Sequence, residues 1–129
     1  MAADRLISSG GPWESVIGYS RAVVAGEYVH VSGSTATIDG VLQHEGDAYS
    51  QAKVAIGVIE SALEQAGYSL ADVVRTRIYL ANSDDLDAVS KAHGEAFSNI
   101  RPAATMLAGL QFVNPKMLVE IEVDAWKAS

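Results

Sequence analysis

A row of carboxylates near the C-terminus is the feature of the sequence with the clearest chemical potential. From Leu118 to Asp124, apolar and acidic residues alternate without a break. Successive side chains of a strand point to opposite faces, so Glu120, Glu122 and Asp124 share one face, with neighbours about 7 Å apart. One interpretation is an acidic row that keeps an edge of the sheet soluble. The other places Glu120 in a cleft, where it moves a proton or holds a water molecule.

A second group of candidate residues lies between positions 93 and 101. His93 falls on the apolar stripe of an expected helix, where a histidine is more often a packed, hydrogen-bonded residue than a catalyst. Glu95 and Arg101 follow it closely, so His93 is also a candidate for proton transfer. Arg101 is expected either to bind the carbonyl groups at the end of that helix or to pair with a surface acid, unless it enters a ligand pocket. No two histidines have the spacing of zinc ligands and there is no cysteine, so we expect no metal site.

The composition indicates an acidic globular protein. The chain has 129 residues, of which 49% are hydrophobic and 19% are charged. This predicts a single domain over residues 1–129, with an irregular lead-in over 1–18. A net charge of -7 repels phosphate backbones and weighs against nucleic-acid binding. The N-terminus lacks the pattern of a signal peptide and no stretch is long enough for a membrane helix, so we expect a cytoplasmic protein without a membrane partner.

Hydrophobic periodicity predicts seven main elements in the order β-β-α-β-α-β-β. They are a hairpin with strands at 22–25 and 28–32, a helix at 47–66, a strand at 73–80, a helix beginning after 82–84, and strands at 105–110 and 118–124. Asp47 caps the first helix and Gly67 ends it. Gly57, inside that helix, indicates close packing against a neighbouring element.

These elements predict a two-layer α+β domain, in which both helices cover one face of a mostly antiparallel sheet. The other face of such a small sheet still has to be covered. A half-apolar face of this kind is commonly buried by self-association. We therefore expect a homo-oligomer.

Four stretches of the chain, taken in order, resemble signatures of the reactive-intermediate deaminase (Rid) family, also called the YjgF, YER057c or endoribonuclease L-PSP family. They are Ile17-Gly18-Tyr19-Ser20, Val31-Ser32-Gly33, Ala66-Gly67 with Asp72-Val73-Val74-Arg75-Thr76, and Arg101-Pro102-Ala103 with Val119-Glu120-Ile121-Glu122. The resemblance implies a chorismate-mutase-like fold assembled as a homotrimer around a central barrel, with three small-molecule pockets at the subunit interfaces.

The resemblance also implies a chemistry that needs no cofactor. Active members hydrolyse reactive enamines or imines to 2-oxo acids and ammonia. A carboxylate corresponding to Glu120 holds or activates the attacking water. The turn at Ser32 and Gly33 fixes the ligand, and Tyr19 reaches the pocket from a neighbouring subunit.

One position departs from the family pattern in a way that affects this chemistry. The family guanidinium, which grips the substrate carboxylate, follows a Pro-Ala pair; here that position is Ala104, followed by Thr105 and Met106. Losing a charged bidentate contact costs about 1.5–3 kcal/mol.

Two functions stay open. One is a hydrolase of small C–N compounds that uses Glu120 with Arg101 or His93 in place of the missing arginine. The other is a trimer that binds a metabolite without turning it over. A third, a nuclease, conflicts with the acidic charge.

Overall fold

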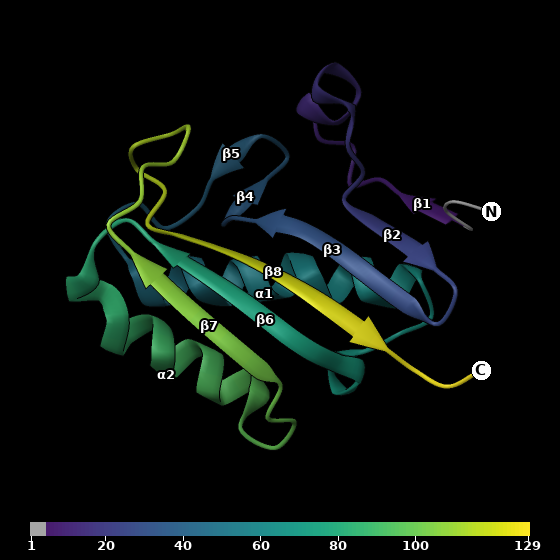
Figure 1. Cartoon of the computed structure of the whole chain (residues 1–129). Helices are drawn as coiled ribbons and strands as arrows, with labels where there is room; N and C mark the ends of the chain where they lie inside the picture. The colour runs from purple at the N-terminus through teal and green to yellow at the C-terminus, as the bar shows by residue number, and fades with distance from the viewer. Residues whose placement is uncertain (1–4) are drawn as a thin grey trace.

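A six-stranded sheet with two helices on one of its faces makes up the fold in the computed structural model, which describes residues 5–129 (Figure 1). The strand order is β1-β2-β3-β8-β6-β7, and every neighbouring pair is antiparallel except β6 and β7. The strands are β1 (Arg5–Ile7), β2 (Ala22–Ala25), β3 (Tyr28–Ser34), β6 (Val73–Leu80), β7 (Ala103–Ala108) and β8 (Val119–Trp126). The predicted two-layer α+β class is confirmed.

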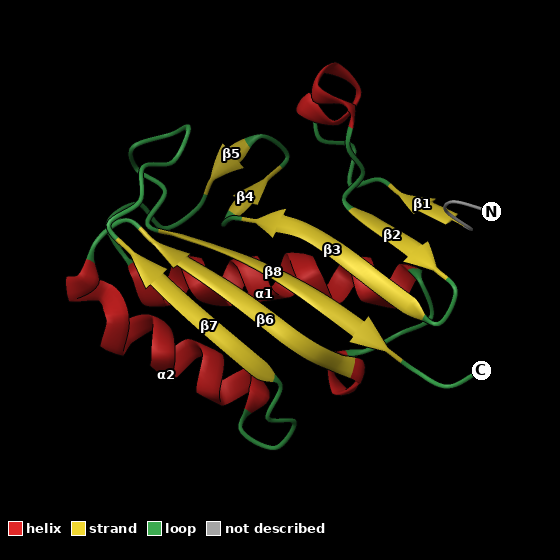
Figure 2. Cartoon of the chain, in the orientation of Figure 1, coloured by secondary structure: helices red, strands yellow, loops and turns green. Residues whose placement is uncertain are grey.

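The remaining elements are two helices, a small hairpin and three short helical turns (Figure 2). They are α1 (Ala48–Gln65), α2 (Leu86–Phe97), the hairpin of β4 (Thr37–Ile38) and β5 (Val41–Leu42), and the turns Glu14–Gly18, Leu70–Asp72 and Ser83–Asp85. Asp39 and Gly40 join β4 to β5 with positive φ angles of 50° and 80°, as the two central residues of a tight hairpin turn require.

The segment expected to be an irregular lead-in is partly regular. Residues Arg5–Ile7 form β1, which pairs with β2 and adds an edge strand to the sheet. The side chain of Ile7 is buried in the core. The expectation failed because a strand of three residues is too short to produce a recognisable alternation.

Helix α1 begins and ends as its sequence predicts. Asp47 Oδ1 accepts a hydrogen bond of 3.0 Å from the backbone N–H of Ser50, which satisfies a free donor of the first turn. Gly67 follows the helix with φ of 82°, a conformation that glycine adopts without steric cost. No helix among residues 5–129 is both long enough and apolar enough to cross a membrane.

The expected close packing at Gly57 is wrong. Gly57 lies on the exposed face of α1, and apart from its chain neighbours and the nearby backbone of the helix itself, no atom lies within 4 Å of the position that a Cβ would occupy there. The glycine therefore costs helix propensity without a packing benefit in this chain.

We expect Gly57→Ala to raise the free energy of unfolding by about 1 kcal/mol, because alanine loses less backbone entropy in a helix and meets open space here. Urea unfolding followed by circular dichroism, at one protein concentration, measures the change. Gly67→Ala is the matched control and should destabilise, since its φ is positive. A stabilised Gly67→Ala, or an unchanged Gly57→Ala, would contradict this account.

The core lies between the sheet and the helices. Its sheet side is made of alternate residues of the central strands, which are fully or almost fully buried: Val29, Val31, Ile78, Val119, Ile121 and Val123. In β6 the alternation slips at the start of the strand, where the register on β8 shifts between Val73 and Arg75. Val73 is consequently buried and Val74 exposed, the reverse of the order that strict alternation predicts for a strand with Thr76 inside.

The acidic row of β8 lies in the middle of the sheet, between β3 and β6, so its interpretation as an edge device is wrong. On the face opposite the helices, Asp124 Oδ1 lies 2.8 Å from His30 Nδ1. Arg77 Nη1 lies 3.4 Å from Glu122 Oε2 and 3.3 Å from Asp124 Oδ2. Cross-strand partners therefore compensate two of the three carboxylates. Glu120 has no such ion pair among the described residues.

Candidate functional site

A hollow of about 430 Å³ surrounds Glu120 on the open face of the sheet. It is lined by Gly33 of β3, Tyr79 of β6, Glu120 and Glu122 of β8, and Leu110, Gln111 and Phe112 of the β7–β8 loop. Figure 1 shows this loop and the β4–β5 hairpin standing together at the end of the sheet where β3, β6 and β7 end and β8 begins. Strand ends and a loop, rather than the core, thus form the walls of the hollow.

Glu120 packs directly on the backbone of Gly33. A Cβ placed on Gly33 would lie 2.7 Å from Glu120 Oε2 and 2.9 Å from its Cδ, distances at which something has to move. The register of β3 on β8 shifts between Val31 and Ser34, and such a bulge redirects a strand locally. The bulge and the missing side chain together let the carboxylate lie flat against β3.

Burial raises the pKa of Glu120 above its ordinary value. The positive charge of Arg21 opposes this shift, and the negative charge of Glu122 adds to it. A carboxyl group with a raised pKa exchanges its proton more readily near neutral pH than an ordinary glutamate does. Glu120 is therefore suited to accept and return a proton.

The raised pKa of Glu120 also predicts a pH-dependent cost to stability. In the unfolded chain the carboxyl ionises around its ordinary pKa of 4.5, whereas the folded state keeps the proton to higher pH. The unfolded state thus binds fewer protons in that window, and stability falls as pH rises through it. As pH rises through this window, we expect the free energy of unfolding of Glu120→Gln to increase relative to that of the parent chain. Above the window the difference between the two should be constant. Urea unfolding from pH 4 to pH 8 measures the difference; a constant difference over the whole range would contradict it.

Arg21 is a residue of the site that was not expected from the sequence. Its Nη1 donates hydrogen bonds to the carbonyl of Gly33 (2.6 Å), to Ser34 Oγ (3.0 Å) and to the carbonyl of Ser32 (3.3 Å). Its guanidinium carbon lies 5.6 Å from the centre of the Tyr19 ring. The one signal in the sequence is a cation two residues after Tyr19, at the start of the apolar strand β2.

Through Arg21 the structure brings together four of the residues expected from the sequence, namely Tyr19, Ser32, Gly33 and Glu120. The hydroxyl of Ser32 is already engaged, since it donates a hydrogen bond of 2.6 Å to the carbonyl of Ser20. Ser32 therefore shapes the turn.

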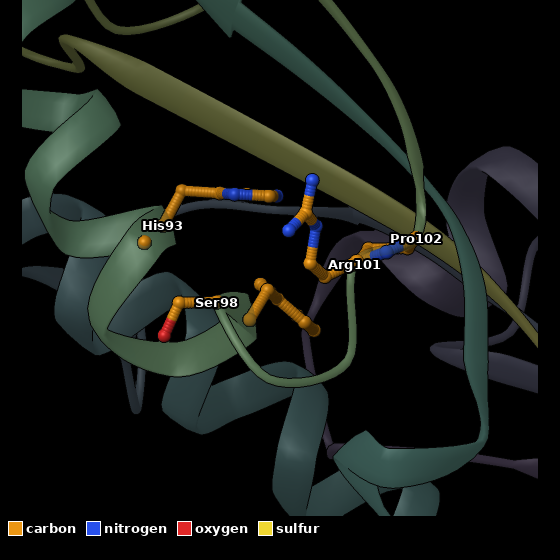
Figure 3. Close-up of a pocket in the computed structure, with 6 residues that line it drawn as sticks. His93, Ser98, Arg101 and Pro102 are labelled. Atoms are coloured by element: carbon orange, nitrogen blue, oxygen red, sulfur yellow. The ribbon is translucent and has the colours of Figure 1, made fainter.

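His93 and Arg101 line a different hollow, of about 300 Å³, together with Gly94, Phe97, Ser98 and Pro102. Figure 3 shows the ring of His93 and the guanidinium of Arg101 projecting into this same space. His93 Nε2 lies 2.9 Å from Thr76 Oγ1, and burial lowers the pKa of the imidazole. His93 is thus a largely neutral, packed histidine with one side open to a hollow.

The end of α2 does not use the Arg101 side chain in any contact found among residues 5–129. The backbone N–H of Arg101 donates to the carbonyl of Phe97 at 2.8 Å instead, with Arg101 at φ of 59°. Thr76, which holds His93, points to the helix side of the sheet, whereas Glu120 lies on the open side. Within one chain, Arg101 and His93 therefore do not share a hollow with Glu120.

Ala104, at the position of the family arginine, and the two residues after it lie on β7, the edge strand next to β6. Ala104 is level with Thr76 of β6, Thr105 with Arg77, and Met106 with Ile78. Ala104 and Thr105 are exposed, and Met106 packs against the core. They are absent from the lining of the Glu120 hollow in this chain.

Residues 5–129 contain no group of three or more His, Asp or Glu side chains placed to hold a metal ion. Two carboxylates of the open face, Glu122 and Asp124, are bound to Arg77, His30 and Tyr79.

Sequence comparison relates the chain to a known family over nearly its whole length. The family model described as Endoribonuclease L-PSP matches residues 12–127. The uncharacterized protein SCO2049 of Streptomyces coelicolor is 43% identical over 127 residues, which cover 98% of this chain and 95% of that protein. The 3-aminoacrylate deaminase RutC of Acinetobacter baylyi is 33% identical over 104 residues, covering 80% of this chain and 82% of RutC.

Structure comparison gives the same relationship. The crystal structure of Rv2704 from Mycobacterium tuberculosis, a member of the YjgF/YER057c/UK114 family, superposes with a TM-score of 0.86 at 43% identity, covering 95% of this chain and 98% of that one. A putative endoribonuclease from Thermotoga maritima superposes with a TM-score of 0.81 at 26% identity, covering 100% of this chain and 98% of that one. The chain therefore belongs to the endoribonuclease L-PSP family, also called the YjgF/YER057c/UK114 or Rid family.

Proposed function

We propose that this chain assembles as a homotrimer whose interfacial pockets, built on Glu120, hydrolyse small imine or enamine compounds. Membership of the family supports a role in handling small metabolites, and a relative at 33% identity is a 3-aminoacrylate deaminase. The observation that carries the catalytic part is the position of Glu120: a half-buried carboxylate with a raised pKa, seated on Gly33 in a hollow with polar and apolar walls.

Hydrolysis of an imine needs one group that moves a proton twice. As a carboxylate, Glu120 takes a proton from water while the water oxygen bonds to the C=N carbon. The carboxyl group then returns that proton to the nitrogen, which gives a carbinolamine. In a second transfer the carboxylate takes the proton of the carbinolamine hydroxyl and gives it to the amino group; the C–N bond breaks as the C=O bond forms, and a carbonyl compound and ammonia leave. An enamine enters the same sequence after it tautomerises to the imine. Gln111, at the wall of the hollow, offers a polar side chain that orients the ligand.

The second candidate function is a trimer that binds a small 2-oxo acid or imine without turnover. Ala104 favours it, because a methyl group at the position of the family guanidinium cannot grip a carboxylate. Arg101 and His93 stay candidates for a contribution from a neighbouring subunit, since they line a hollow open at the surface of their own chain.

Ammonia release tests the hydrolytic proposal. The substrates are freshly generated 2-aminoacrylate and, in parallel, a simple imine without a carboxylate. We expect turnover of at least one substrate above the rate in buffer, and a loss of at least about 100-fold in Glu120→Gln. Ala104→Arg should raise the rate on 2-aminoacrylate and leave the simple imine unaffected, because only the former carries the carboxylate.

The outcomes separate the two candidate functions. Rates equal to buffer for both substrates, with saturable binding of a 2-oxo acid in calorimetry, support the binding trimer. A fully active Glu120→Gln would reject the role given to the carboxylate. Sedimentation that shows a stable lone protomer at micromolar concentration would reject the interfacial pocket.

A further inference from the structure

We propose that Arg21 is the positioning residue of the Glu120 site: its guanidinium holds the Gly33 segment of β3 against the Glu120 carboxylate and supplies the fixed positive charge beside it. This inference rests on the proposed function, because it concerns the same hollow. Arg21 acts on β3 and on the charge of Glu120, and does not grip the ligand itself.

The hydrogen bonds of Arg21 support the first half of this statement. The ladder between β3 and β8 is interrupted between Val31 and Ser34, so backbone groups in this stretch need other partners. Arg21 Nη1 binds two of its carbonyls and the hydroxyl of Ser34, at 2.6 to 3.3 Å. A single planar cation thus fixes the bulge whose other side touches Glu120.

The same geometry shows why Arg21 does not bind a ligand carboxylate in the forked manner. A carboxylate that binds a guanidinium through two hydrogen bonds uses either the Nη1–Nη2 edge or the Nη2–Nε edge. Nη1 is taken by β3, and Nε is buried, without a hydrogen-bond partner among residues 5–129. Nη2 makes one long contact, of 3.5 Å, with the hydroxyl of Tyr19. Neither edge is open to a ligand. The roles left to Arg21 are therefore to position β3 and to supply a positive charge.

The charges around Glu120 support the second half of the statement. The titratable groups that face it are Glu122 on β8, Tyr79 on β6 and Arg21 before β2. Of these, only Arg21 is cationic. Tyr79 donates a hydrogen bond of 2.6 Å to Glu122 and is thereby turned toward that carboxylate. The positive charge of Arg21 is therefore what favours the ionised form of Glu120 against burial and against Glu122.

Three variants separate the two effects. Arg21→Gln removes the charge and keeps a polar amide, which ends two bonds short of Nη1; its comparison with Arg21→Lys, which is also shorter but charged, isolates the effect of the charge. Arg21→Lys keeps the charge, but its ammonium ends one bond short of the position of Nη1, from which all three acceptors are reached. Arg5→Gln, on the edge strand β1, removes the same charge far from the hollow and is the matched control. The readouts are carbon-13 NMR titration of the glutamate carboxyl groups, with the Glu120 signal assigned by its loss in Glu120→Gln, and the kcat and KM of the trimer.

We expect Arg21→Gln to move the titration midpoint of Glu120 upward, together with the acidic limb of the pH–rate profile, and Arg5→Gln to move neither. Arg21→Lys should keep the midpoint close to that of the parent chain but lower kcat at least about tenfold, because Gly33 and Glu120 lose their fixed relation. An unchanged Glu120 midpoint in Arg21→Gln overturns the electrostatic role. Parent-like kcat and KM in Arg21→Lys overturn the positioning role, and this variant decides the matter if Arg21→Gln does not fold.

The NMR titration also separates this inference from the proposed function. A parent chain that releases no ammonia fails as a hydrolase, yet its Glu120 midpoint still responds to Arg21→Gln if the inference holds. If the parent chain is active but the titration midpoint of Glu120 does not change in Arg21→Gln, the proposed function is retained and the inference is rejected.

Discussion

Replacing Gly33 with alanine is expected to lower Glu120-dependent turnover at least about 100-fold while the protein stays folded. The added Cβ would lie 2.7 Å from Glu120 Oε2, 2.9 Å from Cδ and 3.2 Å from Cγ. Real Cβ atoms do not approach other atoms that closely, so the carboxylate has to leave its place. Because the clash is with the end of a flexible side chain, and Gly33 does not have a positive φ, the effect on stability is small.

The ammonia assay measures the loss of turnover and urea unfolding measures the effect on stability, both with the same protein preparation. If the protein binds without turnover, the readout is instead the dissociation constant of a 2-oxo acid. Gly57→Ala is the control for a glycine replacement that meets open space. The double variant Gly33→Ala with Glu120→Gln should lose no more activity than Glu120→Gln alone, because both changes remove the same group. Additive losses, or an active Gly33→Ala, would show that the carboxylate does not work from its observed position.

Replacing Gln51 with methionine is expected to lower the free energy of unfolding by about 2–4 kcal/mol. Gln51 is fully buried, yet its amide makes three hydrogen bonds to backbone groups. Nε2 donates to the carbonyls of His44 (3.1 Å) and Lys116 (3.2 Å), and Oε1 accepts from the N–H of Leu118 (2.9 Å). Methionine has a similar length and no hydrogen-bonding capacity of this kind, so these backbone groups lose their partner where water is excluded.

The matched control is Gln65→Met, at the exposed end of the same helix, where the change should stay within about 0.5 kcal/mol. Urea unfolding at fixed protein concentration compares the two variants, since the stability of an oligomer depends on concentration. Gln51 ties α1 to the β7–β8 loop, which carries Leu110, Gln111 and Phe112. Amide hydrogen exchange in that loop should therefore accelerate in Gln51→Met. Equal stability of the two variants would show that the buried amide is dispensable.

The local features of the fold were readable in the sequence. The alternation of Leu118 to Asp124 predicted a strand with its acids on one face, and that face is the one opposite the helices. Asp47 and Gly67 marked the ends of α1. Such signals act over a few residues, where periodicity and backbone conformation decide the structure. Gly57 was misread because a glycine in a helix does not reveal whether a neighbour approaches it.

The position of β8 in the middle of the sheet was not readable in the same way. Its neighbours β3 and β6 are far from it in the chain, and pairing at that distance is decided by which arrangement buries the apolar residues under the helices. The same pairing brings His30 and Arg77 to the acidic row. A row that looked self-repelling in the sequence is therefore compensated by residues that no local pattern connects to it.

The residues of the site divide in a similar manner. Their chemical types, and the grouping of Tyr19, Ser32, Gly33 and Glu120, followed from the sequence and from the family that it resembles. The role of Arg21 did not, because its partners are carbonyls of β3, which come within reach only when β2 turns back along that strand and the register slips at the bulge. Side-chain chemistry is thus encoded residue by residue, whereas strand order and register, set by burial of the core, decide which groups meet.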